Sequence, residues 1–334
     1  MKDKSPYIIA EVGMAHDGNL NFAHAFIDMV AKTGADAIKF QTHLADYESS
    51  PLEPWRIRFS RLDGKRIDYW RRTEFSRQEW IELASHCESV GLAFMSSPFS
   101  IEAAKVLESC RMKIWKIASG ELLNYPLIDY LSERRVDLLL STGLAEEGEV
   151  DEAVSRIIGR GGNIIGVLEC TSKYPTPLNE VNLIRMRERG VRLNKPYGLS
   201  DHSGDVAPAC IAMTLGASFI EVHVAVGREA FGPDTSASLT GLQVREIVDF
   251  RQKLSLLHNG GTQDQNERTQ MKQRFRKSIY LGRAMQAGEK VTLNDLRFLK
   301  PMAGIGAEFY EQVIGRVAAR DLSEGAPLEW DSLK

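Results

Sequence analysis

Eight short apolar runs, separated by segments with helical spacing, constrain the fold of this chain more than any other feature. In the intervening segments the apolar residues recur every three or four positions, as in Phe22, Phe26 and Val30, where Asn21 is the predicted N-cap. Glycines that often end a helix in a left-handed conformation stand shortly before three of the runs: Gly34, Gly91 and Gly216. The runs are residues 7–12, 36–41, 92–97, 114–119, 137–142, 163–170, 197–201 and 219–225.

This alternation of strand and helix predicts an α/β fold with a parallel sheet. An open, doubly wound sheet also alternates in this way. Eight units within residues 7–225 favour a closed (β/α)8 barrel of the TIM type instead. We therefore expect a barrel domain over residues 1–257.

The pattern changes after the eighth unit. Residues 258–274 are polar and lack an apolar stripe, so they are predicted to form a linker that could be helical in part. Residues 275–334 contain short β-type runs that alternate with the turn sequences AGEKV and EGAPL. We expect these residues to form a small, mostly β domain.

Composition narrows the classes of partner. The 334 residues are 43% hydrophobic and 26% charged, with a net charge of −3, which does not suggest a nucleic-acid or membrane surface as a partner. No run reaches the roughly 18 consecutive apolar residues of a membrane span, and Glu11 interrupts the first apolar run, which argues against a signal peptide. The four cysteines are widely spaced without a CxxC motif, which favours reduced thiols in the cytoplasm.

Polar side chains stand near the end of every predicted strand. In a parallel barrel these ends meet on the face that carries the chemistry. A lone histidine or lysine there is commonly a satisfied structural residue, but two lysines on one face are costly to bury without an anion. The residues are Glu11, Lys39, Gln41, Ser96, Ser97, Lys116, Ser119, Ser141, Thr142, Glu169, Thr171, Ser172, Ser200, Asp201, His202, Glu221 and His223.

Two kinds of site follow from this set. His202 and His223, on adjacent strands, could bind one divalent metal ion, and their residue type leaves manganese, zinc and other ions open. A Ser-His-Asp hydrolase built on the stretch GLSDHSGD is disfavoured, because adjacent strand residues point to opposite faces and no GxSxG motif is present. A cradle for a phosphate or carboxylate could be formed by Lys39, Ser97, Lys116, Ser119, Ser172 and Ser200.

The same residues lie in motifs that resemble the sialic acid synthase family. The motifs are, in order, IIAEVGMAHDGN, GADAIKFQTH, FMSSPFS, WKIASGELLNYPL, LLSTGL, CTSKYPTP, GLSDHSGD, EVHV and GPDTSASL. The C-terminal segment resembles the antifreeze-like (SAF) domain of that family. The resemblance implies a cytoplasmic enzyme, and a homodimer in which the SAF domain covers the active site of the other subunit.

The resemblance also implies a reaction and assigns residues to it. Phosphoenolpyruvate, bound by the cradle, condenses with the open-chain aldehyde of an N-acyl aminosugar. Water then adds, and phosphate leaves by C–O cleavage. His202 and His223 would hold the divalent ion that polarises the aldehyde, manganese in the first place and magnesium or another ion as alternatives. Glu11 is assigned to the reacting centre, and Gln41, Tyr174 and Asp234 are assigned to the sugar.

The chain departs from the family at positions that concern the acceptor sugar. Lys300 stands where the SAF domain commonly offers an arginine, Ala15 and Val222 replace common polar residues, and residues 51–75 match little. N-acetylmannosamine, which gives N-acetylneuraminate, is the default acceptor. A diacetamido-trideoxyhexose, the acceptor of a pseudaminate or legionaminate synthase, is the alternative. A metal-dependent barrel aldolase or isomerase without phosphoenolpyruvate and a non-catalytic carbohydrate-binding protein are more distant alternatives.

Overall fold

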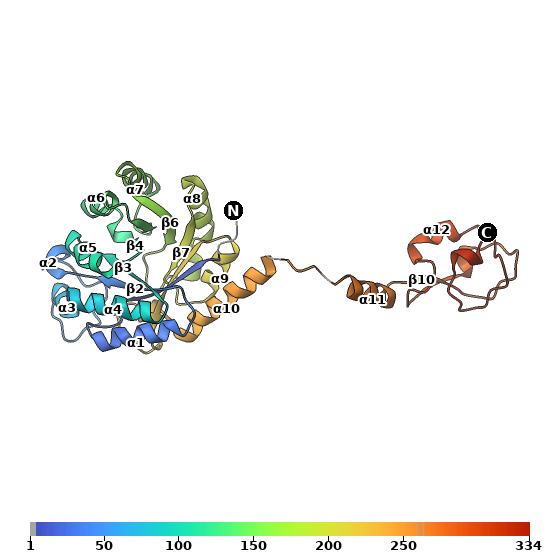
Figure 1. Cartoon of the computed structure of the whole chain (residues 1–334), viewed down its shortest axis with the longest axis horizontal. Helices are drawn as coiled ribbons and strands as arrows, with labels where there is room; N and C mark the ends of the chain where they lie inside the picture. The colour runs from blue at the N-terminus through green and yellow to red at the C-terminus, as the bar shows by residue number, and fades with distance from the viewer. Residues whose placement is uncertain (1–4, 259, 263) are drawn as a thin grey trace. The chain divides into compact units, whose positions relative to one another are not determined.

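The computed structural model describes residues 5–258, 260–262 and 264–334. Contacts divide the chain into two compact units, Met1–His258 and Asn259–Lys334 (Figure 1). The first unit is a nearly closed barrel of eight parallel strands, surrounded by helices, so the predicted barrel fold is confirmed. The second unit is a small domain that is described by itself below.

All eight predicted strands are present in the barrel. Their hydrogen-bonded order is β3-β2-β1-β8-β7-β6-β5-β4, and β3 lies next to β4 without a hydrogen-bonded pairing among the described residues. The strands are β1 (Tyr7–Gly13), β2 (Ala37–Thr42), β3 (Ala93–Pro98), β4 (Ile114–Ile117), β5 (Asp137–Ser141), β6 (Asn163–Cys170), β7 (Tyr197–Asp201) and β8 (Phe219–Ala225). A two-residue strand, β9 (Leu239–Thr240), pairs with β8.

The helices begin where side chains satisfy their first free amides. Asn19 caps the first helix by accepting a hydrogen bond from the amide of Phe22, so the prediction of Asn21 as the cap is wrong. Ser76 and Glu79 form a capping box at α4. The helices of the barrel unit are α1 (Leu20–Ala31), α2 (Ala45–Glu48), α3 (Arg66–Thr73), α4 (Arg77–Ser89), α5 (Ile101–Leu107), α6 (Tyr125–Glu133), α7 (Glu147–Gly159), α8 (Leu183–Leu193), α9 (Ala207–Thr214) and α10 (Gly241–His258).

The strand pleat divides the barrel interior into an apolar and a polar part. Inward-facing apolar residues near the start of the strands form a separate small cluster that includes Ile9, Ala37 and Met95. Two residues further along each strand the side chain returns to the same side. Glu11 therefore follows Ile9, and Lys39 follows Ala37, on the inward face of the barrel. This alternation places a layer of charged side chains next to a layer of apolar side chains inside the barrel, further along the strands.

The second unit contains the predicted small domain. Helix α11 (Gln265–Phe275) lies in the segment that was predicted to be a linker. Strands β10 (Ser278–Leu281) and β11 (Leu296–Leu299) pair in antiparallel fashion, and a short helix, α12 (Tyr310–Val313), follows. A separate core, which includes Ile279, Val313 and Leu328, is buried within this unit.

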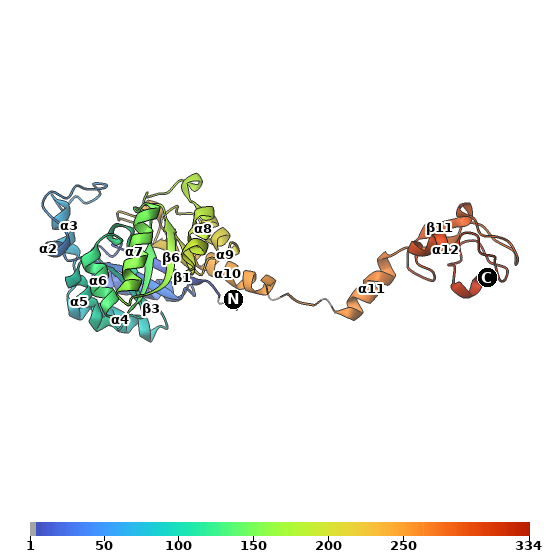
Figure 2. The ribbon, with the colours of Figure 1, turned by 90° about the horizontal axis from the view of Figure 1, so that it is seen from above.

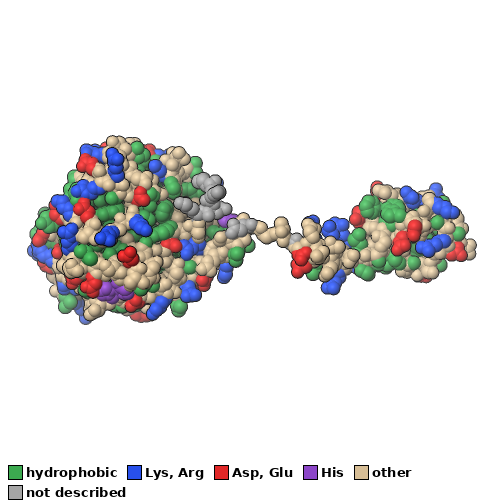
Figure 3. All heavy atoms as spheres, in the orientation of Figure 1, with side chains coloured by type: hydrophobic (Ala, Val, Ile, Leu, Met, Phe, Trp, Pro, Cys, Tyr) green, Lys and Arg blue, Asp and Glu red, His purple; other side chains and the backbone are tan. Residues whose placement is uncertain are grey.

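The surface agrees with the balanced composition of the chain. On the face of the barrel unit seen in Figure 3, Lys and Arg side chains are interspersed with Asp and Glu side chains. Within the described part of the chain, no helix has both the length and the apolar character needed to cross a membrane.

Candidate active site

Four charged side chains lie together inside the barrel, on strands β1, β2, β4 and β8. Lys39 Nζ lies 2.7 Å from Glu11 Oε2 and 3.7 Å from Glu221 Oε1. Lys116 Nζ lies 2.9 Å from the same Glu221 oxygen. Each of these side chains is at most 3% exposed. Two ammonium groups and two carboxylates thus form a buried cluster without net charge.

The position of each lysine in the cluster shifts its pKa in a different direction. Burial lowers the pKa of Lys39, but Glu11 and Glu221 raise it more, and the net shift is upward. Burial lowers the pKa of Lys116, and the attraction of Glu221 does not fully oppose this effect. Burial raises the pKa of Glu221, but Lys116 and Lys39 together lower it by more than burial raises it. The net shift is downward, so this carboxylate remains ionised. Of the two lysines, Lys116 is therefore the one whose positive charge gains more from an additional anion nearby.

Hydroxyl groups extend the cluster along the predicted cradle. Lys39 Nζ donates to Ser97 Oγ at 3.3 Å, and Ser200 Oγ donates to Glu221 Oε1 at 3.0 Å. The hydroxyls of Ser119 and Ser172 form a second pair at 3.0 Å. The structure thus connects Lys39, Ser97, Lys116 and Ser200 through Glu221 and Glu11, with Ser119 and Ser172 as a neighbouring pair.

The two predicted metal ligands lie side by side. The rings of His202 and His223 have centroids 5.1 Å apart, and both residues are 4% exposed. His202 Nδ1 donates to the carbonyl oxygen of Thr171 at 2.8 Å, because a carbonyl oxygen can only accept. Burial and the neighbouring His223 lower the pKa of His202 to about 3, so the ring is neutral and its Nε2 carries the free lone pair.

This arrangement fits a divalent metal ion. A neutral imidazole with its other nitrogen held by a carbonyl oxygen is the usual form of a histidine ligand. Asp234 Oδ2 lies 3.8 Å from His223 Nδ1. Across the described residues, no group of three or more His, Cys, Asp or Glu side chains is arranged to hold a metal ion. Further ligands of an ion at the two histidines would therefore include water or substrate oxygens.

The residues that the resemblance assigns to the sugar line one cavity. Gln41 Nε2 donates to Glu11 Oε1 at 2.9 Å. The ring of Tyr174 stacks on His202, with centroids 4.1 Å apart. Gln41, Tyr174 and Asp234 all line one cavity of about 660 Å³, together with Ser119 and Ser172.

Lys300 belongs to the second unit. There its ammonium group lies 5.5 Å from the centre of the Phe275 ring.

The hydrogen bonds around the stretch GLSDHSGD do not form a hydrolase triad. Ser200 bonds to Glu221, and His202 bonds to Thr171. Asp201 Oδ2 accepts hydrogen bonds from the amide and the hydroxyl of Ser203. The three residues Ser200, Asp201 and His202 therefore have separate partners, and no hydrogen bond between Ser200 and His202 is present to form the serine–histidine pair of a triad.

Two residues of the site were not among the predicted site residues. Glu221 belongs to the polar strand-end set, and its position two residues before His223 on β8 was a usable signal for an inward orientation. Arg56 lies in the segment 51–75, whose sequence shows no periodic pattern. Its guanidinium group lies 4.3 Å from the centre of the Tyr174 ring and forms an ion pair with Asp234. Only the folded structure reveals this contact.

Comparisons with known proteins agree with this arrangement. The NeuB family model matches residues 26–262, and the SAF domain model matches residues 276–334. The chain is 31% identical to N,N'-diacetyllegionaminic acid synthase of Campylobacter jejuni, over 96% of this chain and 98% of the relative. It is also 31% identical to pseudaminic acid synthase of Helicobacter pylori, over 98% of both chains.

A solved structure supports the same relationship. N-acetylneuraminic acid synthetase of Leptospira borgpetersenii, crystallised with citrate, superimposes with a TM-score of 0.69 and 26% identity, over 80% of this chain and 90% of that one. The family model covers more than half of the chain, and the relatives named above are synthases matched over nearly their whole length. The chain therefore belongs to the NeuB family, whose members are synthases of carbohydrate biosynthesis, and it carries a SAF domain at its C-terminal end.

Proposed function

We propose that this chain is a nonulosonic acid synthase, which condenses phosphoenolpyruvate with an N-acyl aminosugar and water and releases phosphate by C–O cleavage. The observation that carries the proposal is the buried cluster of Lys39, Lys116, Glu11 and Glu221 together with the adjacent pair of histidines, His202 and His223. A barrel aldolase or isomerase that does not use phosphoenolpyruvate has no need for two buried ammonium groups.

The lysines have a clear role toward an anionic substrate. In the free protein, Lys39 and Lys116 neutralise Glu11 and Glu221. The phosphate and carboxylate of phosphoenolpyruvate would bind to these ammonium groups and to the hydroxyls of Ser97, Ser119, Ser172 and Ser200. These contacts stabilise the bound substrate throughout the reaction, so they contribute to affinity more than to the chemical step.

The carboxylate of Glu11 supports the chemical step itself. The attack of the methylene carbon on the aldehyde leaves positive charge on the carbon that bears the phosphate oxygen. A buried carboxylate, held by Lys39 and by Gln41 Nε2, is preorganised to stabilise this charge. Water then adds to that carbon, and the bond between carbon and the phosphate oxygen breaks.

His202 and His223 would hold a divalent ion, with manganese the first candidate and magnesium the second. Such an ion supplies Lewis-acid polarisation of the aldehyde oxygen. The hydrogen bond from His202 Nδ1 to Thr171 fixes the ring and leaves Nε2 as the atom that would bind the ion. Tyr174 stacks on the same ring and limits its rotation.

The acceptor is an uncharged N-acyl aminosugar in this proposal. The cavity is lined by four carboxylates, Glu48, Glu53, Glu121 and Asp234, and by two arginines. This balance disfavours a phosphorylated sugar. N-acetylmannosamine is the default acceptor, and a diacetamido-trideoxyhexose is the second candidate. The second candidate is supported by the names of the Campylobacter jejuni and Helicobacter pylori relatives and by the aromatic side chains that line the cavity.

The assembly and location of the enzyme are also part of the proposal. We propose a cytoplasmic homodimer in which the SAF domain, with Lys300, covers the active site of a second copy. Mass measurement in solution tests the dimer. Loss of sugar affinity after Lys300→Ala, without a change in affinity for phosphoenolpyruvate, tests the role of the SAF domain.

Phosphate release tests the reaction. The purified chain is treated with a chelator, supplied with manganese or magnesium, and mixed with phosphoenolpyruvate and one sugar at a time. Phosphate should appear only when metal, phosphoenolpyruvate and an N-acyl aminosugar are all present, and the product should exceed the sugar by the mass of one pyruvic acid in mass spectrometry. Absence of phosphate release with every sugar would contradict the proposed function.

A further inference from the structure

Arg56 connects the segment 51–75 to the proposed sugar site. Its guanidinium group lies over the face of Tyr174, 4.3 Å from the ring centre. One of its nitrogens donates to the carbonyl oxygen of Pro233 at 3.2 Å and also bonds to Asp234. The side chain is 36% exposed and lines the 660 Å³ cavity. Two residues that the family resemblance assigns to the sugar, Tyr174 and Asp234, thus share one arginine from this segment.

The segment is anchored to the barrel. Arg72 Nη2 donates to Asp17 at 2.9 Å and to Asp63 at 2.9 Å, which joins α3 to the loop after β1. A methyl group at Gly18 would lie 2.7 Å from the carbonyl oxygen of Arg72, so the two backbones are in close contact. Figure 2 shows the loop between α2 and α3 at the same end of the barrel as the loop between β6 and α8, which contains Tyr174. Arg56 therefore belongs to a segment, residues 51–75, that is attached to the barrel and forms one wall of the cavity.

The ring contacts strengthen this wall. The ring of His43 lies between Trp70 of α3 and Phe99, with centroids 3.9 and 4.1 Å away. Trp55 and Phe59 pack against Tyr69 at centroid distances of 5.9 and 5.0 Å. All of these side chains except Phe99 belong to the segment or stack directly on it. An apolar group of a ligand would meet these rings inside the cavity.

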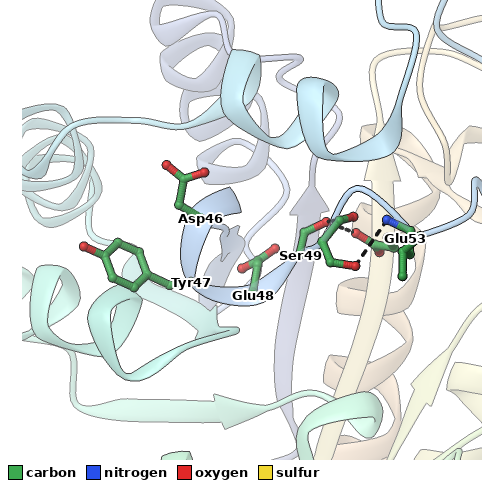
Figure 4. A pocket seen from close by; sticks show the side chains of 7 residues that line it. Asp46, Tyr47, Glu48, Ser49 and Glu53 are labelled. Carbon is green, nitrogen blue, oxygen red and sulfur yellow. Dashed lines mark hydrogen bonds between the residues drawn. The ribbon is translucent and has the colours of Figure 1, made fainter.

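The charges around the cavity determine which ligand group Arg56 can bind. Glu48 and Glu53 line this cavity and also line a second pocket beside α2 (Figure 4). Arg66 is paired with Glu53 at 3.1 Å, and Arg56 is the arginine that lies over Tyr174 and contacts Asp234. A guanidinium group only donates hydrogen bonds, and it therefore binds an oxygen acceptor. The carbonyl oxygen of an acyl group is such an acceptor, and it brings no negative charge into an acidic cavity.

We propose that Arg56 is a specificity-determining residue that binds an acyl carbonyl oxygen of the acceptor sugar, with the adjacent acyl methyl group against the aromatic rings of the segment 51–75. This inference rests on the proposed function, because it names the group of the sugar that the cavity recognises. Binding of the sugar would give Arg56 an acceptor in addition to Pro233 and Asp234. A sugar with a hydroxyl in place of the acylamino group would lack both the carbonyl oxygen and the methyl group.

The test compares Arg56→Ala with the wild-type enzyme on three sugars: mannose, N-acetylmannosamine and a diacetamido-trideoxyhexose. Loss of a hydrogen bond to a charged donor should raise the KM for the acylated sugars roughly 10- to 100-fold. The KM for phosphoenolpyruvate should remain unchanged. The preference for an acylated sugar over mannose should fall by the same factor. Arg56→Lys, which keeps the charge but loses the planar fork, should recover only part of the affinity.

The matched control is Arg61→Ala. Arg61 is exposed on the same segment, forms no hydrogen bond or ion pair with the described residues, and does not line the cavity. Its removal changes the charge of the segment equally but should leave both KM values unchanged. Thermal melting of each variant checks that the fold is retained.

Binding measurements separate this inference from the proposed function. Calorimetry with N-acetylmannosamine and with the diacetamido-trideoxyhexose reports affinity without turnover. If the wild-type enzyme releases phosphate but Arg56→Ala loses affinity for mannose, acylated sugars and phosphoenolpyruvate alike, Arg56 is only structural and the inference is wrong. An unchanged preference for acylated sugars would overturn it as well. If the wild-type chain neither binds an acylated sugar nor releases phosphate, the proposed function fails together with the inference.

Discussion

Replacement of Lys116 by methionine tests the buried cluster directly. The variant keeps the length of the side chain but removes the charge that lies 2.9 Å from Glu221 Oε1. Both side chains are 3% exposed, so water cannot replace the lost partner. Removal of one member of a buried ion pair typically lowers the free energy of unfolding by about 3–5 kcal/mol. Lys39 lies 3.7 Å from the same oxygen and compensates in part, so we expect a loss of about 3–4 kcal/mol.

The loss should appear in thermal unfolding of the intact chain. For a domain of this size, about 1 kcal/mol corresponds to roughly 2–4 °C, so the transition of the barrel unit should fall by roughly 6–16 °C. Glu221→Gln should cause a loss of similar size. The double variant Lys116→Met with Glu221→Gln should be less destabilised than the sum of the single variants, because it leaves no unpaired charge at this point.

Two results would refute this reasoning. Melting of Lys116→Met within about 1 kcal/mol of the wild type would mean that the pair contributes no stability. Additive effects of the two single variants would mean that they do not interact. In the same variant, the KM for phosphoenolpyruvate should rise roughly 10- to 100-fold. Full activity of Lys116→Met on a sugar without phosphoenolpyruvate would instead favour an aldolase.

Three further predictions concern the metal, the anchoring of the segment 51–75 and the contact between β7 and β8. His202→Ala should no longer bind manganese after chelator treatment, as measured by electron paramagnetic resonance, and binding equal to the wild type would contradict the ligand assignment. Burial raises the pKa of Asp63, but hydrogen bonds from Arg72 and Ser60 lower it by more than burial raises it, so the pKa lies below the usual value. Its contribution to stability is therefore present above the unfolded pKa near 3.9 and is lost as the pH falls through the folded pKa. The difference in melting temperature between the wild type and Asp63→Asn should shrink from pH 7 to about pH 3, and a constant difference would exclude this linkage. Gly198→Ala would place a methyl group 2.1 Å from the carbonyl oxygen of the neighbouring strand and should cost about 3 kcal/mol or more in unfolding. Gly148→Ala, where a methyl group meets nothing within 4 Å, is the matched control and should not destabilise the chain.

Local patterns in the sequence were sufficient to predict the strands of the barrel. The apolar run at 7–12 became β1, and the run at 219–225 became β8. The period of two also places Glu11 and Lys39 on the inward side. Helix ends were harder to predict, because Asn19 and Asn21 flank the first helical residue, Leu20, and either side chain could cap a helix.

The convergence of the site residues followed from the fold class alone. Parallel strands deliver their carboxyl ends to one face, so Lys39, Lys116, His202 and His223 were predicted to meet although they lie far apart in the chain. What the sequence could not provide was the pairing within this set. Whether Glu221 contacts one lysine, two lysines or none depends on the register and tilt of strands that are separated by more than a hundred residues.

The tertiary structure alone decided the role of the segment 51–75. Its residues show no repeated spacing that would place Arg56 over Tyr174 or beside Asp234, which is 178 residues away in the chain. The position of Arg56 results instead from contacts of Arg72 with Asp17 and Asp63 and from the packing of aromatic rings. Periodic hydrophobic patterns determine secondary structure because they act over a few residues. Loop positions depend on non-local contacts, and these exist only in the folded barrel.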